Sequence, residues 1–89
     1  MRKEFIVTDP VGLHARPATL LVNEAGKYVA DAKIIVGEKE ANLKSIMGVM
    51  SLAIANGQDF SIEFTGDDAE TAIQGIEKVV VDSGIGAAK

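Results

Sequence analysis

The chain has 89 residues, no cysteine, a single histidine and a formal net charge of −4 at pH 7, with a sequence isoelectric point near 4.8. Without cysteine it forms no disulfide and lacks thiolate ligands for zinc, and one histidine cannot supply a metal cluster. The acidic balance and the scattered lysines and arginines argue against direct binding of nucleic acid.

The length predicts one domain over residues 1–89, with a modest core and a function exercised at the surface. The basic N-terminus is not followed by the apolar stretch of a signal peptide, and no segment approaches the length of a membrane span. We therefore expect a cytoplasmic protein that is not inserted in a membrane. No residue pattern points to a bound cofactor or metal.

The chain begins with a strand pattern followed by a helix pattern. Residues 5–8 are rich in β-forming side chains and end at an Asp-Pro turn signal, which predicts a first strand. From residue 15, apolar side chains recur at helical spacing until Gly26 closes the run. Pro17 fits the first turn of this helix, where its missing N–H costs nothing. A helix is therefore expected directly after His14.

The second part of the chain contains more strands and a final helix. Residues 32–36 and 40–43 predict a hairpin around Gly37-Glu38, with glycine where positive φ is required. Apolar and polar residues alternate over 60–65, which predicts a half-buried strand. A last helix is expected from residue 69, opened by the acidic box Asp67-Asp68-Ala69-Glu70 and stopped by Gly84.

The apolar segment 45–54 adds a middle helix, so the predicted order is βαββαβα. Strands that are apolar on one side, with helices between them, favour an α+β fold. We expect an open-faced β-sandwich in which three helices cover one face of a four-stranded, mostly antiparallel sheet. The other face would meet water.

His14 lies in Gly-Leu-His-Ala-Arg-Pro-Ala-Thr at 12–19, where the strand pattern gives way to the helix pattern. An imidazole is a usable nucleophile near neutral pH, and the free N–H groups at a helix start hold anions. Arg16 could add a guanidinium fork for the same anion. These features indicate phosphate chemistry, and the alternative is an ordinary capping or surface histidine.

The middle helix is apolar on more sides than a short surface helix needs. At about 100° per residue, its apolar side chains fall on two faces. One face holds Val49, Leu52 and Ala53, and the other holds Ile46, Met47, Met50 and Ile54. The first face can serve the core. The second is either a partner surface, for which methionine gives adaptable packing, or is buried as well.

Ser45 stands where the N-cap of this helix belongs. As a cap, its hydroxyl accepts from a free N–H of the first turn and stabilises the helix by about 1 kcal/mol. As a modification site, it would carry roughly two negative charges beside Met47 when phosphorylated, and the helix dipole would tolerate them. The residues alone leave both interpretations open.

Two motifs together resemble a known family. Gly-Leu-His-Ala-Arg-Pro-Ala-Thr at 12–19 and Asn-Leu-Lys-Ser-Ile-Met-Gly-Val-Met-Ser-Leu at 42–52 are similar to HPr, the histidine-containing phosphocarrier of the bacterial phosphoenolpyruvate-dependent sugar phosphotransferase system (PTS). The second motif is similar to the Gram-positive form. The resemblance covers essentially the whole chain and implies the same βαββαβα fold.

The resemblance implies roles for individual residues. His14 matches the acceptor that takes phosphate on Nδ1 from enzyme I and passes it to enzyme IIA components. Arg16 matches the arginine that engages partner carboxylates or the phosphate, whose oxygens the amides of Ala15 and Arg16 would hold. Ser45 matches the target of HPr kinase/phosphorylase, and its phosphorylated form in the family acts as corepressor for a catabolite-control transcription factor. The docking surface for these partners would be Ile46, Met47 and Met50.

Two other functions stay open beside the carrier. One is a regulatory paralogue, such as the nitrogen-related HPr-like protein, which serves a different relay. The other is a pure binding or corepressor module that works through Ser45 and the apolar face alone, and the combination of His14, Arg16 and Pro17 counts against it.

Overall fold

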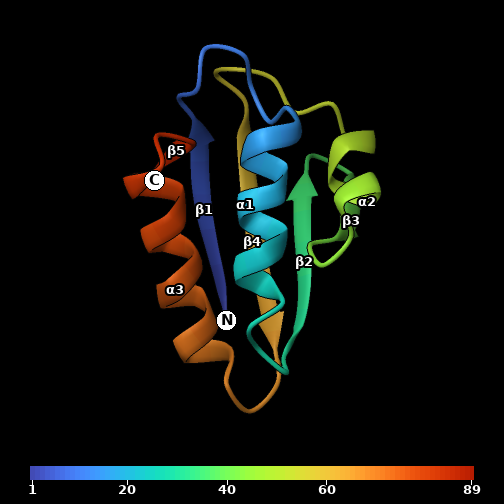
Figure 1. Cartoon of the computed structure of the whole chain (residues 1–89), viewed down its shortest axis with the longest axis vertical. Coiled ribbons are helices and arrows are strands. Elements are labelled where there is room, and N and C mark those ends of the chain that lie inside the picture. Colours follow the sequence, from blue (N-terminus) through green and yellow to red (C-terminus); the bar gives the residue numbers. More distant parts are fainter.

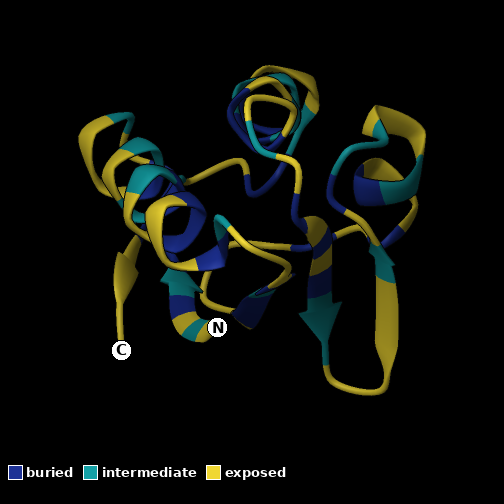
Figure 2. Ribbon diagram, turned by 90° about the horizontal axis from the view of Figure 1, so that it is seen from below, coloured by how far each residue is buried: buried dark blue, intermediate teal, exposed yellow.

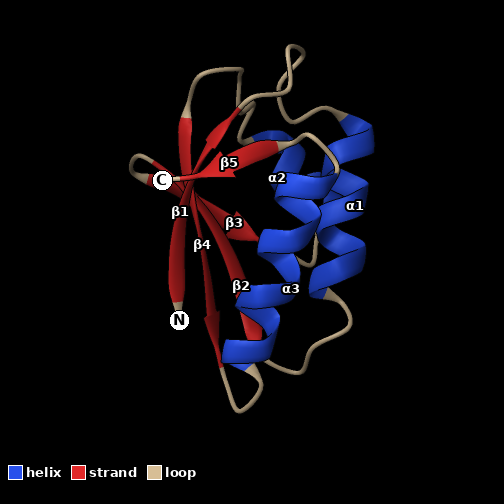
Figure 3. Ribbon diagram, turned by 90° about the vertical axis from the view of Figure 1, so that its left-hand side faces the viewer, coloured by secondary structure: helices blue, strands red, loops and turns tan.

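The computed structural model describes residues 1–89 and contains five strands and three helices. Their order along the chain is β1 (Arg2–Val7), α1 (Ala15–Ala25), β2 (Asp31–Val36), β3 (Lys39–Asn42), α2 (Ile46–Ser51), β4 (Asp59–Thr65), α3 (Ala69–Asp82) and β5 (Gly86–Ala88). The strands form one antiparallel sheet in the order β3-β2-β4-β1-β5. All three helices lie on one face of it (Figures 1 and 3). The predicted α+β fold is confirmed.

The core lies between the sheet and the helices. Phe60, Ile62 and Phe64 of β4 are all buried, as the alternation in the sequence predicts. Phe5 of β1 stacks on Phe60 with ring centroids 5.3 Å apart. Figure 2 shows that the buried residues of the helices lie on the sides that face the sheet. None of the three helices has the length and hydropathy needed to cross a membrane.

β5 is a fifth strand that the sequence pattern does not predict. Its residues are glycine and alanine, which have little preference for strands. It forms because Ile85 is buried and the following residues pair with β1. A Cβ on Gly86 would lie 2.4 Å from the carbonyl oxygen of Ile6, so only glycine fits at this crossing. The strand is therefore a product of tertiary packing.

The hairpin between β2 and β3 turns at Gly37, whose φ is +59° as expected. The acidic box at the start of α3 does not cap the helix through its side chain as expected. Asp68 is the N-cap residue, but its side chain makes no capping hydrogen bond. Its two carboxylate oxygens accept the N–H groups of Val29 and Ala30, each at 2.9 Å. The capping interpretation is therefore wrong, and the side chain of Asp68 instead connects α3 by hydrogen bonds to the loop that follows α1.

The hydrogen bonds to the Asp68 carboxylate predict that the stability of the protein depends on pH. The Val29 amide, with a further contribution from Ala30, lowers the pKa of Asp68 below its usual range, although partial burial opposes the shift. Because the unfolded chain takes up this proton at a higher pH than the folded chain, the free energy of unfolding falls as pH drops below about 4. In Asp68→Asn, we expect lower stability at pH 7 and a smaller loss between pH 7 and pH 3. Urea unfolding of both proteins at the two pH values measures this, and identical losses would contradict it.

Candidate functional site

His14 is the N-cap residue of α1 and lies in the loop that leads from β1 into this helix. Its backbone is extended, at φ −84° and ψ −167°, and its side chain makes no capping hydrogen bond. The side chain is 39% exposed. The imidazole is therefore accessible, while its backbone is fixed at the start of the helix.

The loop before His14 depends on Gly12. This residue has φ +85°, and a Cβ there would lie 2.6 Å from the carbonyl oxygen of Ile54. The next residue, Leu13, is buried, and its N–H donates to the same carbonyl at 2.9 Å. The His14 loop and the loop after α2 thus lie side by side at one end of the molecule (Figure 1). Glycine is required because both the left-handed backbone and the close approach exclude a side chain.

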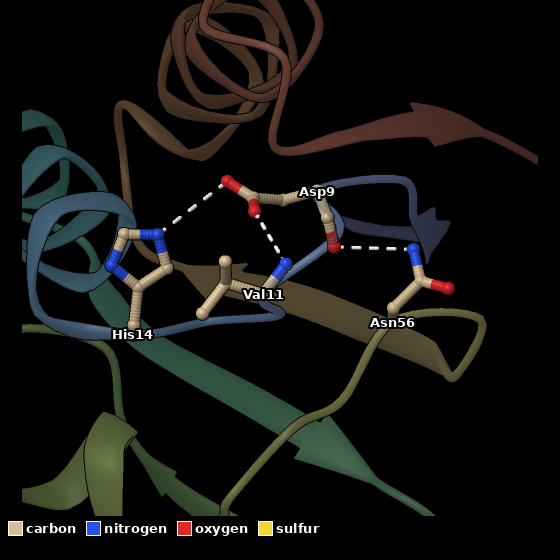
Figure 4. A network of polar contacts seen from close by, with 4 residues as sticks. All are labelled: Asp9, Val11, His14 and Asn56. Carbon is tan, nitrogen blue, oxygen red and sulfur yellow. Dashed lines mark hydrogen bonds and ion pairs between the residues drawn. The ribbon is translucent and has the colours of Figure 1, made fainter.

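A small polar network holds this end of the molecule together. One carboxylate oxygen of Asp9 accepts the Val11 N–H at 2.9 Å, and the carbonyl of Asp9 accepts from the Asn56 side chain at 3.1 Å. The other carboxylate oxygen lies 3.6 Å from Nε2 of His14 (Figure 4). Sequence reasoning missed Asp9 and Asn56. The only signal was the Asp-Pro pair, which indicates a turn but says nothing about the direction of the carboxylate.

The first turn of α1 leaves backbone donors free beside His14. The first helical hydrogen bond is donated by Ala18 to the carbonyl of His14, at 3.0 Å. The amides of Ala15 and Arg16 precede it and have no acceptor, and Pro17 has no N–H. The Arg16 side chain is exposed and takes part in none of the ion pairs. Two free amides and a free guanidinium therefore follow the imidazole directly, which is an arrangement suited to an anion.

Ser45 caps α2, as its position predicts. Its backbone is extended, and Oγ accepts the Gly48 N–H at 3.1 Å. The side chain is partly exposed. α2 packs against α1 and lies beside the half of that helix nearest to His14 (Figures 1 and 3). Ser45 stands at the end of α2 farther from His14: the neighbouring Lys44 donates to the carbonyl of Tyr28, beyond the end of α1, whereas the other end of α2 leads into the loop beside His14.

The apolar residues of segment 45–54 are not buried and exposed in the way that the two predicted helix faces imply. Val49 and Leu52 are buried, and Ile46, Met47 and Met50 are exposed, with Met47 83% exposed. The placement of Ala53 in the core and of Ile54 on the outer face is wrong, because Ala53 is exposed and Ile54 is buried. The reason is that α2 ends at Ser51 and Ala53 adopts a positive φ of 50°, so the helical period does not extend to these residues.

His14 does not lie in an enclosed active site. The one hollow in the surface, of about 420 Å³, lies along β2 and β3 and is lined by residues such as Lys33 and Glu40. No group of three His, Asp or Glu residues is placed to hold a metal ion. His14 is therefore an open surface site, and any reaction there relies on a partner to exclude water.

Comparisons with known proteins agree with this picture. The family model for the PTS HPr component phosphorylation site matches residues 1–82. The phosphocarrier protein HPr of Mycoplasma capricolum is 49% identical over 80 residues, which is 90% of each chain. A solved Mycoplasma histidine-containing phosphocarrier protein is 46% identical, with a TM-score of 0.93 over 96% of this chain and 97% of its own. HPr from Bacillus anthracis is 43% identical, with a TM-score of 0.81 over 89% and 94% of the two chains. The chain therefore belongs to the HPr family of the PTS and is a phosphocarrier, a protein that carries a phosphoryl group instead of catalysing a reaction of its own.

Proposed function

We propose that His14 is the residue that carries the phosphoryl group, accepting it from phospho-enzyme I and passing it to sugar-specific enzyme IIA in the cytoplasm. The observation that supports this most is the exposed imidazole at the start of α1, followed by two amides without acceptors. His14 is also the only histidine in a chain of this family.

The chemistry asks little of the carrier itself. A ring nitrogen, Nδ1 by resemblance to the family, attacks the phosphorus while the donor's bond to phosphorus breaks and its electron pair returns to the donor. The amides of Ala15 and Arg16 and the Arg16 guanidinium then hold the phosphate oxygens. Phosphoryl transfer depends mainly on positioning and charge stabilisation. An exposed site completed by each partner in turn is therefore sufficient, and it leaves release easy.

The test is transfer from a defined donor. Incubated with phosphoenolpyruvate and a sugar-type enzyme I, the protein should gain one acid-labile phosphate and lose it on addition of an enzyme IIA. Intact-protein mass spectrometry at neutral and acidic pH measures this. If only a nitrogen-type enzyme I homologue charges the protein, the regulatory paralogue is correct. If neither does, the corepressor module is the better assignment.

We propose Ser45 as a regulatory site for HPr kinase/phosphorylase. Its Oγ is partly exposed at the start of α2, next to Ile46 and Met47, which belong to the proposed docking surface of Ile46, Met47 and Met50. A phosphate there would place roughly two negative charges at the edge of this apolar surface without breaking the helix, because anions are tolerated at a helix start. It would weaken docking of enzyme I and create the form that binds a catabolite-control transcription factor.

Ser51 offers a control for this site, because it lies on the same helix and its Oγ donates to the Gly48 carbonyl. With ATP and a Gram-positive HPr kinase, wild type and Ser51→Ala should gain one acid-stable phosphate and Ser45→Ala none. Phosphorylated wild type should accept phosphate at His14 at least about tenfold more slowly. Ser45→Ala should also lose about 1 kcal/mol of unfolding free energy with the cap. Absence of added mass on wild type would contradict the regulatory proposal.

A further inference from the structure

Asp9 is held in one place by hydrogen bonds on both its backbone and its side chain. Its N–H donates to Ile85, and its carbonyl accepts from Gly12 at 3.0 Å and from Asn56 at 3.1 Å. Oδ1 accepts the Val11 N–H at 2.9 Å. The side chain is only 17% exposed. The direction of the second carboxylate oxygen is therefore set by the loop and not by a freely rotating side chain.

That second oxygen, Oδ2, has one neighbour that can form a polar contact, Nε2 of His14 at 3.6 Å. Nδ1, on the other side of the ring, points away from Asp9 (Figure 4). An ionised carboxylate only accepts hydrogen bonds, so it favours the imidazole tautomer that carries its proton on Nε2. Nδ1 then keeps its lone pair. Such contacts are commonly long before a partner binds and shorten in the reactive complex.

We propose that Asp9 is a positioning residue that fixes the tautomer of His14 and so prepares Nδ1 as the nucleophile. This rests on the proposed role of His14 as acceptor. As the Nδ1–phosphorus bond forms, the proton stays on Nε2 and the ring gains positive charge, which the carboxylate balances. When the phosphoryl group leaves, the electron pair of the Nδ1–phosphorus bond returns to Nδ1 and the starting tautomer is restored.

The sharpest test is Asp9→Asn, because asparagine has the same shape. Its amide oxygen can keep the Val11 bond, and its NH₂ group then faces Nε2 of His14. An NH₂ donor requires a lone pair on Nε2, which forces the ring proton onto Nδ1. The same exchange of a carboxylate for an amide inactivates histidine-based triads through the wrong tautomer. We expect ¹⁵N NMR of the imidazole to show the proton on Nε2 in wild type and on Nδ1 in Asp9→Asn. Phosphate uptake should slow by at least about tenfold.

Asn56→Ala separates positioning from support of the loop. The substitution removes the hydrogen bond to the Asp9 carbonyl and leaves the Asp9 carboxylate facing His14. The imidazole of His14 should therefore keep the wild-type tautomer. If Asp9→Asn keeps either the wild-type tautomer or the wild-type rate of uptake, the proposal is wrong. If wild type takes up no phosphate at all, the proposed function fails, whereas the NMR comparison still decides the effect of Asp9 on the ring.

Discussion

His14→Ala is expected to take up no phosphate from phosphoenolpyruvate and enzyme I. The substitution removes the only imidazole of the chain, and the amides of Ala15 and Arg16 can hold a phosphate but offer no nucleophile. The fold should tolerate the change, because the side chain is 39% exposed and caps nothing. We expect the unfolding free energy to stay within about 0.5 kcal/mol of wild type. Acid-labile phosphate on the intact protein is the measurement.

Ser45→Ala is the matched control for this experiment, since it removes the other proposed phosphate site and leaves His14 in place. It should still become charged by enzyme I. Acid-labile phosphate on His14→Ala would show that another residue is the acceptor, and the proposed function would then lose its central residue.

In Met47→Gln, the concentration of carrier that gives a half-maximal rate of phosphorylation by enzyme I is expected to rise at least about tenfold. Met47 is 83% exposed on α2, and this helix lies beside the half of α1 nearest to His14 (Figure 1). Glutamine keeps the length and the helix preference of methionine but must bury an amide when a partner covers it. Folding should therefore be unaffected, because the side chain contributes little to the core.

Val29→Gln makes the same type of change at another exposed position. Val29 is 88% exposed and follows α1, so it lies beyond the far end of a helix about 16 Å long that begins at His14. Its charging should equal that of wild type. Equal losses in the two variants would indicate a general effect of surface polarity and would remove Met47 from the docking surface.

Much of the fold follows from local pattern. The helical spacing of Ala18, Leu21 and Ala25 and the alternation of Phe60, Ile62 and Phe64 each specify an element and its buried side, and the structure confirms both. These patterns work because burial of a continuous apolar stripe is a property of neighbours in sequence. The end of α2 at Ser51 could not be predicted in this way, since the apolar residues continue beyond it.

Only some residues of the candidate site could be predicted from the sequence. His14, Arg16 and Ser45 stand out from the sequence because each sits at the start of a helix, where free amides and dipole direction depend on a few consecutive residues. Their roles as acceptor, phosphate partner and regulatory site remain proposals. Asp9 does not stand out, because the contact of its carboxylate with the imidazole depends on how the whole loop is folded.

The sequence by itself determined that three helices and four of the strands form, and it placed His14 and Ser45 at helix starts. Only the tertiary structure decided the fifth strand, the use of Asp68 and the direction of Asp9. β5 forms through pairing with β1, and Asp68 binds amides almost 40 residues away in the chain, at Val29 and Ala30. The physical reason is the range of the interactions. Periodicity and capping act between residues a few positions apart, whereas pairing at a sheet edge and hydrogen bonds between loops exist only once distant segments have been brought together.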